Sequence, residues 1–383
     1  MRVRFRIALT ALLLLLSGCR MRDTAAQKPT ATPELEVVIA YLEAPNTDAA
    51  VSPASWVPND SDAPAQATTA PAPTHTPKAG SKPTEMPRYI VPEGVYTIGW
   101  ISDPQHYSAK FPAYYESMTA FLRDQREALR LAYVINTGDL VHKTSDEKQW
   151  EVAVRAQAAL EEIPNGVLAG NHDCQEPDRF EPYGRHFGEK KYKDKPWYGG
   201  SYQNNRGHYD LMTIGKTDYL FVYMSFGPDN GCIKWLNKVL SQYPDRVAFL
   251  CLHDYFTNEY VRSEDGEKLF SKVVKKQPNV RFVLCGHRYG AVCRPESLDD
   301  DGDGRPDRTV YQMMFNYQAA GKEGGDGYLR LMQFDEANRT LHMLTYSPSL
   351  DDFNRFDDPA MRETHYDIDE TAEEFTIPIE WLP

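Results

Sequence analysis

The sequence predicts an α/β fold, and two observations lead to this prediction. From Val91 onward, short apolar runs alternate with segments in which apolar residues recur at helical spacing. This pattern is typical of strands joined by helical crossovers. Five of the apolar runs also end in a carboxylate, an amide or an imidazole. Because ligands of open α/β sheets bind beyond the carboxyl ends of the strands, these polar residues are the candidate functional residues.

The first half of this region alternates regularly. We expect strands over 95–101, 132–136 and 167–170, with helices over 111–131 and about 146–162 between them. Because each helix connects two strands, neighbouring parallel strands with right-handed crossovers are expected.

The second half contains more strands than helices. After an aromatic-rich excursion over 174–210, a helix is expected over 233–241. The expected strands are 219–225, 247–252, 281–285, 309–318, 327–334 and 340–346. The folded domain is therefore predicted over 91–350, followed by an acidic, weakly patterned C-terminal extension over 351–383 that packs on the domain or trails from it.

The N-terminus is predicted to be a lipoprotein signal peptide over residues 1–18. A basic start precedes an apolar run that is too short to span a bilayer. The run ends in Leu16-Ser17-Gly18-Cys19, which resembles the bacterial lipobox and implies cleavage before Cys19 and acylation of its thiol. The alternative is an ordinary cleaved signal with an incidental cysteine. The resemblance implies a membrane partner and a lipid-anchored, extracytoplasmic or cell-surface location.

Residues 19–90 are predicted to be a disordered, extended tether rich in Pro, Ala and Thr. Twelve of the 27 prolines lie between positions 20 and 92, and such a stretch cannot bury enough apolar surface to offset its ordering entropy. The net charge is −13, and it becomes −16 when the three arginines of the signal are removed. A chain this acidic gains no affinity for nucleic acid from counterion release. We therefore expect no nucleic-acid partner. We expect a monomer.

The central motif is Val167-Leu168-Ala169-Gly170-Asn171-His172-Asp173. The buried strand expected here breaks at the glycine into three adjacent polar side chains. These residues favour chemistry over packing, although Asn171 and Asp173 could instead be turn formers at a polar corner.

Similar polar residues end four other apolar runs, namely Asp103, Asp139, His253 and His287. Oxygen and imidazole ligands from separate strands are typical of a mixed site for zinc, manganese or iron. In this order the motifs resemble the calcineurin-like metallophosphoesterase superfamily, whose pattern is Asp-x-His, Gly-Asp, Gly-Asn-His-Asp/Glu, His and Gly-His-x-His. The resemblance covers about residues 93–346. It implies a four-layer α/β/β/α sandwich with two mixed sheets face to face.

The resemblance also implies two divalent metal ions and a role for each motif. Asp139 would bridge both metals, and Asp103 would belong to the first. The remaining ligands of the second metal would be Asn171, His253 and His287. His172 would be the general acid aimed at the leaving-group oxygen, with Asp173 orienting it. The implied activity is metal-dependent hydrolysis of a small phosphomonoester or phosphodiester, without a Ser or Cys nucleophile.

Two departures from the family pattern affect the first metal. Gln105 stands where the family usually has His, with His106 one place later. The last motif reads Gly286-His287-Arg288-Tyr289, without its second His. Three outcomes are open: a weak first site completed by Gln105 or His106, a one-metal enzyme, or a degenerate binder. The alternative function is therefore a non-catalytic surface lipoprotein that binds a phosphorylated ligand on the same fold.

Four residues are further candidates for contacts with substrate or metal. His142 could reach the phosphate from its loop or lie on the surface, and Arg288 could contact the phosphate or be a solvated charge. His106 and Tyr289 are the other two.

An acidic loop is a candidate calcium site. Asp299, Asp301, Asp303 and Asp307 occupy positions 1, 3, 5 and 9 of a sequence that matches the first half of an EF-hand loop. Val310 replaces the bidentate glutamate of position 12. The alternative is an acidic, glycine-rich hairpin loop without an ion.

The cysteines form no Cys-x-x-Cys pair. Cys251 and Cys285 are expected to be buried thiols inside strands. Cys174, Cys232 and Cys293 are expected in loops, where a disulfide could form outside the cytoplasm.

Overall fold

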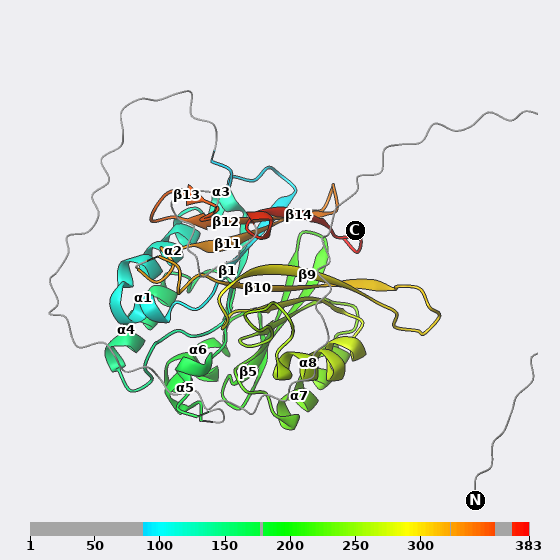
Figure 1. The fold of residues 1–383 in the computed structure, drawn as a ribbon, viewed down its shortest axis with the longest axis horizontal. Coiled ribbons are helices and arrows are strands. Elements are labelled where there is room, and N and C mark those ends of the chain that lie inside the picture. Colours follow the sequence, from blue (N-terminus) through cyan, green and yellow to red (C-terminus); the bar gives the residue numbers. More distant parts are fainter. Residues whose placement is uncertain (1–86, 177–178, 322, 357–369, 383) are drawn as a thin grey trace, which may run out of the picture. The chain divides into compact units, whose positions relative to one another are not determined.

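The computed structural model describes residues 87–176, 179–321, 323–356 and 370–382 (Figure 1). The predictions for the signal peptide, for Cys19 and for nearly all of the tether fall on residues 1–86, outside the described residues. Among the described helices, none is long and apolar enough to cross a membrane.

The described residues form two seven-stranded sheets. Sheet 1 has the order β13-β12-β11-β1-β2-β3, with β14 also paired to β12. Its strands β1, β2 and β3 are parallel, and the other pairs are antiparallel. The bounds are β1 Val95–Ile101, β2 Leu131–Asn136, β3 Asn165–Val167, β11 Leu329–Asp335, β12 Thr340–Ser347, β13 Asp352–Phe353 and β14 Phe375–Pro378.

Sheet 2 has the order β4-β5-β6-β7-β8-β10-β9. The central strands β6, β7, β8 and β10 are parallel, whereas β4, β5 and β9 pair in the antiparallel sense. The bounds are β4 Tyr198–Tyr202, β5 Gly207–Ile214, β6 Thr217–Met224, β7 Val247–Leu252, β8 Val280–Cys285, β9 Gly290–Leu298 and β10 Arg308–Asn316.

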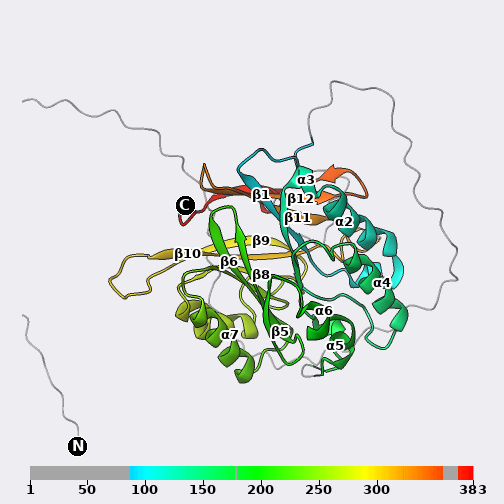
Figure 2. The same ribbon diagram turned by 180° about the vertical axis from the view of Figure 1, so that it is seen from behind.

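Helices cover the outer face of each sheet, so the fold has four layers (Figures 1 and 2). One buried cluster lies between the sheets and includes Trp100 of β1 and Phe249 of β7. A second cluster joins sheet 1 to its helices, and a third joins sheet 2 to α7 and α8. The α/β/β/α prediction is therefore confirmed. The helices are α1 Gln105–Lys110, α2 Pro112–Asp124, α3 Arg126–Leu129, α4 Glu147–Ala158, α5 Glu181–Phe187, α6 Glu189–Tyr192, α7 Asn230–Gln242 and α8 Glu264–Lys272.

Three of these helices begin where the sequence supplies an N-cap side chain. Asp146 accepts the backbone N–H of Lys148 at the start of α4, and Asp229 accepts that of Cys232 in α7. Ser263 does the same for α8. Each cap satisfies a backbone donor that would otherwise lack a partner in the first turn.

The expected elements differ from the observed ones in several places. The strand expected over 167–170 ends at Val167, and the buried residues after it lead into a short 3-10 helix at Asn171–Asp173. The helix expected over 111–131 is divided at Gln125. Strands β4, β5 and β9 and helix α8 were not predicted. Strands β4 and β9 are incompletely buried, so they lack the continuous apolar run of a central strand.

The cysteine predictions are partly wrong. Cys251 and Cys285 are buried in the neighbouring strands β7 and β8, as expected. Cys232, however, lies in α7 and Cys293 in β9 instead of in loops. All five cysteines among the described residues are free, so the disulfide that we considered is not found there.

The C-terminal segment packs on the domain where the structure describes it. Strand β14 extends sheet 1, and Ile379 and Leu382 after it are buried between the sheets. Trp381 contacts the rings of Phe282 and Tyr311 in sheet 2. Residues 370–382 therefore connect the two sheets at this end of the sandwich.

A buried histidine between the sheets makes stability depend on pH. His208 of β5 stacks on Tyr223 of β6 with ring centroids 4.3 Å apart, and its Nδ1 is buried without a hydrogen-bond partner. Burial lowers the pKa of His208 to about 3, because the charged ring cannot be solvated there. The unfolded chain therefore binds a proton at His208 below the ordinary pKa of 6.5, while the folded protein does not.

We expect His208 to destabilise the fold progressively as the pH falls from 6.5. The free energy of unfolding should fall by about 1.4 kcal/mol per pH unit, which amounts to about 2 kcal/mol at pH 5. His208→Phe keeps the stacked ring but cannot titrate. Between pH 6.5 and pH 5, the unfolding free energy of this variant should therefore fall by about 2 kcal/mol less than that of the wild type. Urea unfolding at pH 7 and pH 5 measures the difference. An equal pH dependence in both proteins would contradict the assignment.

Candidate metal centre and catalytic site

The predicted site residues follow strands of both sheets. Asp103 and Asp139 follow β1 and β2 of sheet 1, whereas His253 and His287 follow β7 and β8 of sheet 2. Asn171 begins the 3-10 helix after β3. The carboxyl ends of these parallel strands lie at one end of the sandwich, which is where ligands of α/β sheets bind.

The four residues that we predicted for the second metal converge. Ligand atoms of Asp139, His253 and His287 all lie within 4.8 Å of one another. The Asn171 Oδ1 atom is 3.0 Å from His253 Nε2, and Asp139 Oδ1 is 3.3 Å from the same nitrogen. One carboxylate, one amide oxygen and two imidazoles form a donor set that suits zinc, manganese or iron, so these residues fit a divalent cation.

The ring of His253 is oriented by the backbone. Its Nδ1 lies 2.8 Å from the carbonyl oxygen of Thr137. Because a carbonyl can only accept, Nδ1 carries the proton and Nε2 faces Asp139 and Asn171. Ligand histidines in metalloproteins are commonly held in this way.

The ionisable side chains of the site change one another's pKa. Burial alone would lower the pKa of His253, but the neighbouring Asp139 carboxylate raises it to about 10. Burial would likewise raise the pKa of Asp139, but His253 lowers it below its ordinary value. Burial, together with His253, lowers the pKa of His287 to about 3 and keeps that ring neutral. His253 thus balances the charge of the central carboxylate.

A second group of oxygen atoms lies on the other side of Asp139. Ser102 donates a hydrogen bond to Asp103, whose carboxylate also accepts the backbone N–H of His287. The Nε2 of Gln105 donates to Asp139 Oδ2 over 2.8 Å. The Oε1 of Gln105 is buried and has no hydrogen-bond partner. A buried, unpartnered amide oxygen on a residue that is bonded to Asp139 fits a first cation better than it fits a packed core.

The backbone at these positions is unusual. Asp103, Asp139 and His287 have φ of +52°, +55° and +67°. For residues other than glycine this left-handed region costs on the order of 1 kcal/mol or more, and such strain gathers at functional sites. Gly170 supplies space beside them, because a Cβ there would lie 2.0 Å from Asp139 Oδ1 and 2.6 Å from His253 Cε1.

His172 lies beside the cation ligands. Its backbone N–H donates to Asp139 Oδ1 over 2.9 Å, and its ring Nδ1 is 2.9 Å from the carbonyl oxygen of His142. The rings of His172 and His142 are stacked with centroids 5.0 Å apart. An imidazole with one nitrogen held by a carbonyl is suited to proton transfer through the other.

Asp173, which we expected to orient the ring of His172, binds the backbone of the neighbouring loops, and its effect on the ring stays a prediction. The Asp173 carboxylate accepts the backbone N–H groups of Leu140, Val141 and Gly170 at 2.8–3.0 Å. It is fully buried. Asp173 therefore holds the two loops together, because its short side chain is directed at their backbones, and the ring of His172 meets the carbonyl of His142.

The further candidates lie around the ligands. The ring of His106 meets that of His142 edge-on at 5.6 Å. The Nδ1 of His142 is buried without a hydrogen-bond partner, and burial, followed by the nearby His172, lowers the pKa of His142 to about 4. Arg288 and Tyr289 follow His287 and are exposed.

The sequence did not indicate two contributors to the site. The ring of Phe226, after β6, lies 6.0 Å from that of His253 and 5.6 Å from that of His287. Its position at a strand end was the available signal. The carbonyl of Thr137 orients His253, and a backbone group carries no signal in the sequence.

The acidic loop joins β9 to β10. Ligand oxygens of Asp299, Asp301 and Asp307 lie within 4.8 Å of one another, and these residues are exposed. Asp303 is not in this group, and its carboxylate accepts the N–H of Arg305. Exposed acidic groups commonly gather without an ion, so calcium binding stays a prediction.

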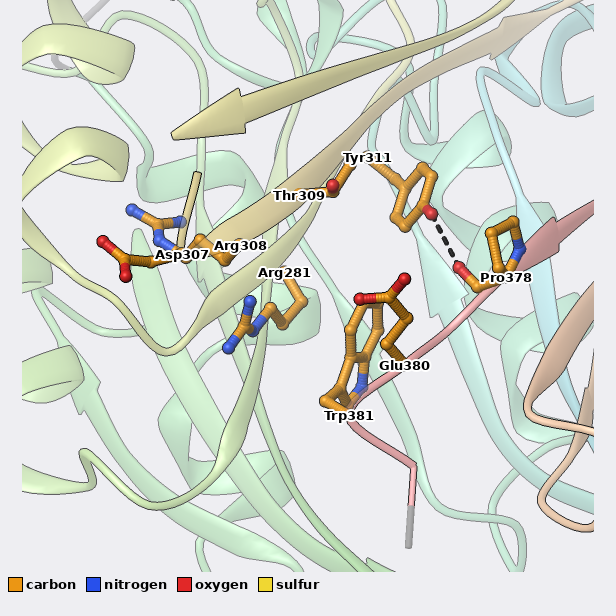
Figure 3. Close-up of a pocket in the computed structure, with 8 residues that line it drawn as sticks. All are labelled: Arg281, Asp307, Arg308, Thr309, Tyr311, Pro378, Glu380 and Trp381. Carbon is orange, nitrogen blue, oxygen red and sulfur yellow. Dashed lines mark hydrogen bonds between the residues drawn. The ribbon is translucent and has the colours of Figure 1, made fainter. Parts of the chain in front are cut away.

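A cavity of about 300 Å³ lies elsewhere, at the opposite ends of β8 and β10 (Figure 3). Arg281 and Trp381 line it, together with Arg308, whose guanidinium is already bonded to Asp300 and to the carbonyl of Val280. Asp307 of the acidic loop lines this cavity, but none of the ligands predicted for the two phosphoesterase cations does. We therefore assign the chemistry to the cluster around Asp139.

Comparisons with known proteins agree with the motif order. A family model described as "Calcineurin-like phosphoesterase" matches residues 96–289. The "Uncharacterized protein YvnB" of Bacillus subtilis (strain 168) is 46% identical over 266 residues, which are 69% of this chain and 21% of that protein. The chain thus spans about a fifth of the length of this curated relative.

Two solved structures match part of this chain with little sequence identity. A purple acid phosphatase, PPD1, from yellow lupin seeds is 12% identical, with a TM-score of 0.47 over 75% of this chain and 54% of that one. The protein TT1561 of Thermus thermophilus is 14% identical, with a TM-score of 0.41 over 65% of this chain and 98% of that one.

Gly170→Ala should weaken cation binding by about tenfold or more, because the added methyl group displaces Asp139 or His253. Isothermal titration calorimetry with Zn²⁺ or Mn²⁺ measures the affinity for the cation. Gly94→Ala is the matched control. It has a positive φ but meets nothing within 4 Å, so it should cost only stability, about 1 kcal/mol or more. Equal affinities in wild type and Gly170→Ala would contradict the assigned ligand set.

Proposed function

Because the chain belongs to the calcineurin-like phosphoesterase family, we propose that it hydrolyses phosphomonoester or phosphodiester bonds of a small substrate in a metal-dependent reaction. The observation that supports this most is the convergence of Asp139, Asn171, His253 and His287 from four separate loops. No packing requirement explains why two buried imidazoles, an amide and a carboxylate should meet there.

Each ligand has a role in this proposal. Asn171, His253 and His287 would hold the second cation, and Asp139 would serve both. Asp103 and the unpartnered Oε1 of Gln105 would hold the first. When bound, divalent cations supply charge stabilisation for the phosphoryl oxygens and a water molecule acidic enough to attack at neutral pH. Manganese, zinc and iron are the candidates.

His172 is the proposed general acid. Its Nδ1 proton is engaged by the carbonyl of His142, so a second proton on Nε2 is the one that can be donated. Donation to the leaving-group oxygen neutralises the charge that develops there as the bond to phosphorus breaks. Since phosphoryl transfer depends mainly on charge stabilisation and positioning, no covalent nucleophile is required.

The rival proposal is a surface protein that binds a phosphorylated ligand without turnover. Its support is the absence of both first-site imidazoles of the family pattern, replaced by Gln105 and Tyr289. His172 favours the enzyme, because a binding protein has no need of a proton donor beside the cation ligands.

Metal analysis combined with turnover of 4-nitrophenyl phosphate and bis(4-nitrophenyl) phosphate separates the two proposals. For an enzyme, Mn²⁺ or Zn²⁺ should restore activity to chelator-treated protein. His172→Ala should then lower kcat by about 10²–10⁴-fold for the corresponding phenyl ester, whose leaving group needs the proton, and much less for the nitrophenyl ester, while the bound metal is retained. Asp139→Asn should lose both metal and activity. The control His342→Ala alters a histidine on β12, paired with Glu374, and should change neither. Full metal occupancy without turnover of either ester would establish the binder.

We further propose that the domain works outside the cytoplasm, anchored to the membrane through lipid on Cys19. The support is the lipobox-like sequence before Cys19 and the proline-rich stretch after it. In bacterial cells the whole chain should fractionate with membranes and require detergent for release, whereas Cys19→Ser should be found in soluble fractions. Membrane association that survives this substitution would contradict the anchor.

A further inference from the structure

The proton-donating geometry of His172 depends on a main-chain atom. Its Nδ1 meets the carbonyl oxygen of His142 at 2.9 Å, and the ring of His142 stacks on it. A carbonyl accepts only, so this contact selects the tautomer with the proton on Nδ1. This tautomer of His172 is favoured only while the carbonyl of His142 stays in this position. A group that fixes the backbone at His142 therefore also fixes the proton donor, His172.

One side chain accepts hydrogen bonds from two successive backbone groups of this loop. The Oε1 of Gln149 accepts the N–H of His142 over 2.8 Å and the N–H of Lys143 over 2.9 Å. Gln149 is only 7% exposed and lies in the first turn of α4. Its Nε2 donates to Asp146, the N-cap residue of the same helix, over 3.1 Å. Both ends of the amide are therefore engaged.

The peptide group between His142 and Lys143 explains why this contact matters. Its N–H is held by Gln149, and its carbonyl is the group that meets His172. Because a peptide group is planar, fixing the direction of its N–H also fixes the direction of its carbonyl. Gln149 thus aims the carbonyl at His172 from the side opposite to the ring.

Other contacts hold the loop at some distance from this peptide. Asp173 accepts the N–H groups of Leu140 and Val141, and Trp150 donates to the carbonyl of Thr144 over 3.0 Å. These contacts restrain the loop before and after the critical peptide. Among the described residues, only Gln149 is bonded to its N–H.

We propose that Gln149 is a positioning residue for His172, acting through the peptide group that joins His142 to Lys143. The inference rests on the proposed function, because the position of His172 matters only if the ring donates a proton. Gln149 contacts neither substrate nor cation in this scheme. Its loss should leave the cation ligands in place and let the His142 carbonyl turn away from His172.

The test compares three variants of two buried glutamines on α4. Gln149→Met removes the acceptor at nearly constant volume. Gln149→Glu keeps an acceptor oxygen for both N–H groups but gives up the donor to Asp146, so it should lose stability and keep the positioning. Gln157→Met is the matched control, because Gln157 is also buried on α4 but bonds to the hydroxyl of Tyr115 instead of the loop.

Leaving groups of different acidity separate positioning from general damage. 4-Nitrophenolate leaves without a proton, whereas phenolate depends on the general acid. With the ester class that the wild type hydrolyses, Gln149→Met should lower kcat about tenfold or more for the phenyl ester and less than about twofold for the nitrophenyl ester. KM should stay unchanged. Gln149→Glu and Gln157→Met should keep the wild-type ratio of the two rates.

A second readout does not need turnover. In the whole chain labelled with ¹⁵N-histidine, the wild type should show His172 with its proton on Nδ1. Gln149→Met should show a mixture of tautomers, and Gln157→Met should resemble the wild type. If no ester is hydrolysed, the proposed function fails, and this measurement still decides the positioning. An unchanged tautomer in Gln149→Met, or an equal loss of activity with both esters, would overturn the inference.

Discussion

The buried carboxylate of Asp139 is the constraint on which the site depends. One oxygen accepts the backbone N–H of His172 and lies 3.3 Å from His253 Nε2, and the other accepts Gln105 Nε2. These partners follow strands of both sheets. Because an isolated buried charge is very costly, the loops are held in the arrangement that keeps this carboxylate solvated by protein groups. A single ionised group thus contacts loops from both halves of the sandwich.

The strain of the surrounding backbone is a consequence of this arrangement. Asp103, Asp139 and His287 are all left-handed, and each lies just beyond the end of a central strand. Packing on both faces of each sheet holds the strand ends in place, so the loops cannot relax. The four-layer core therefore maintains the strained ligand geometry, with the cost of strain distributed over a large buried interior.

Two kinds of group position the reactive side chains. Side chains such as Asp173 and Gln149 bind the backbone of a loop, and backbone carbonyls of Thr137 and His142 bind the imidazoles of His253 and His172. Asp173 and Gln149 therefore act on the site through the loop backbone. Because peptide groups are planar, holding the N–H of one also sets the direction of its carbonyl. Few side chains take part in the proposed chemistry. Their positions depend on several loops and on the first turn of α4.

The α/β class, most central strands and the candidate ligands could be predicted from the residues themselves, because burial imposes apolar runs and carboxylate and imidazole side chains interrupt such runs only for a reason. The four-layer architecture was implied by the resemblance to the family. The sequence did not reveal the partly buried strands β4 and β9, whose patterns are weak. The tertiary structure was needed to show that Asp173 binds the backbone of two loops and that the carbonyl of His142 meets the ring of His172. Every residue has the same carbonyl group, so its direction depends on the path of the chain and not on the letter in the sequence.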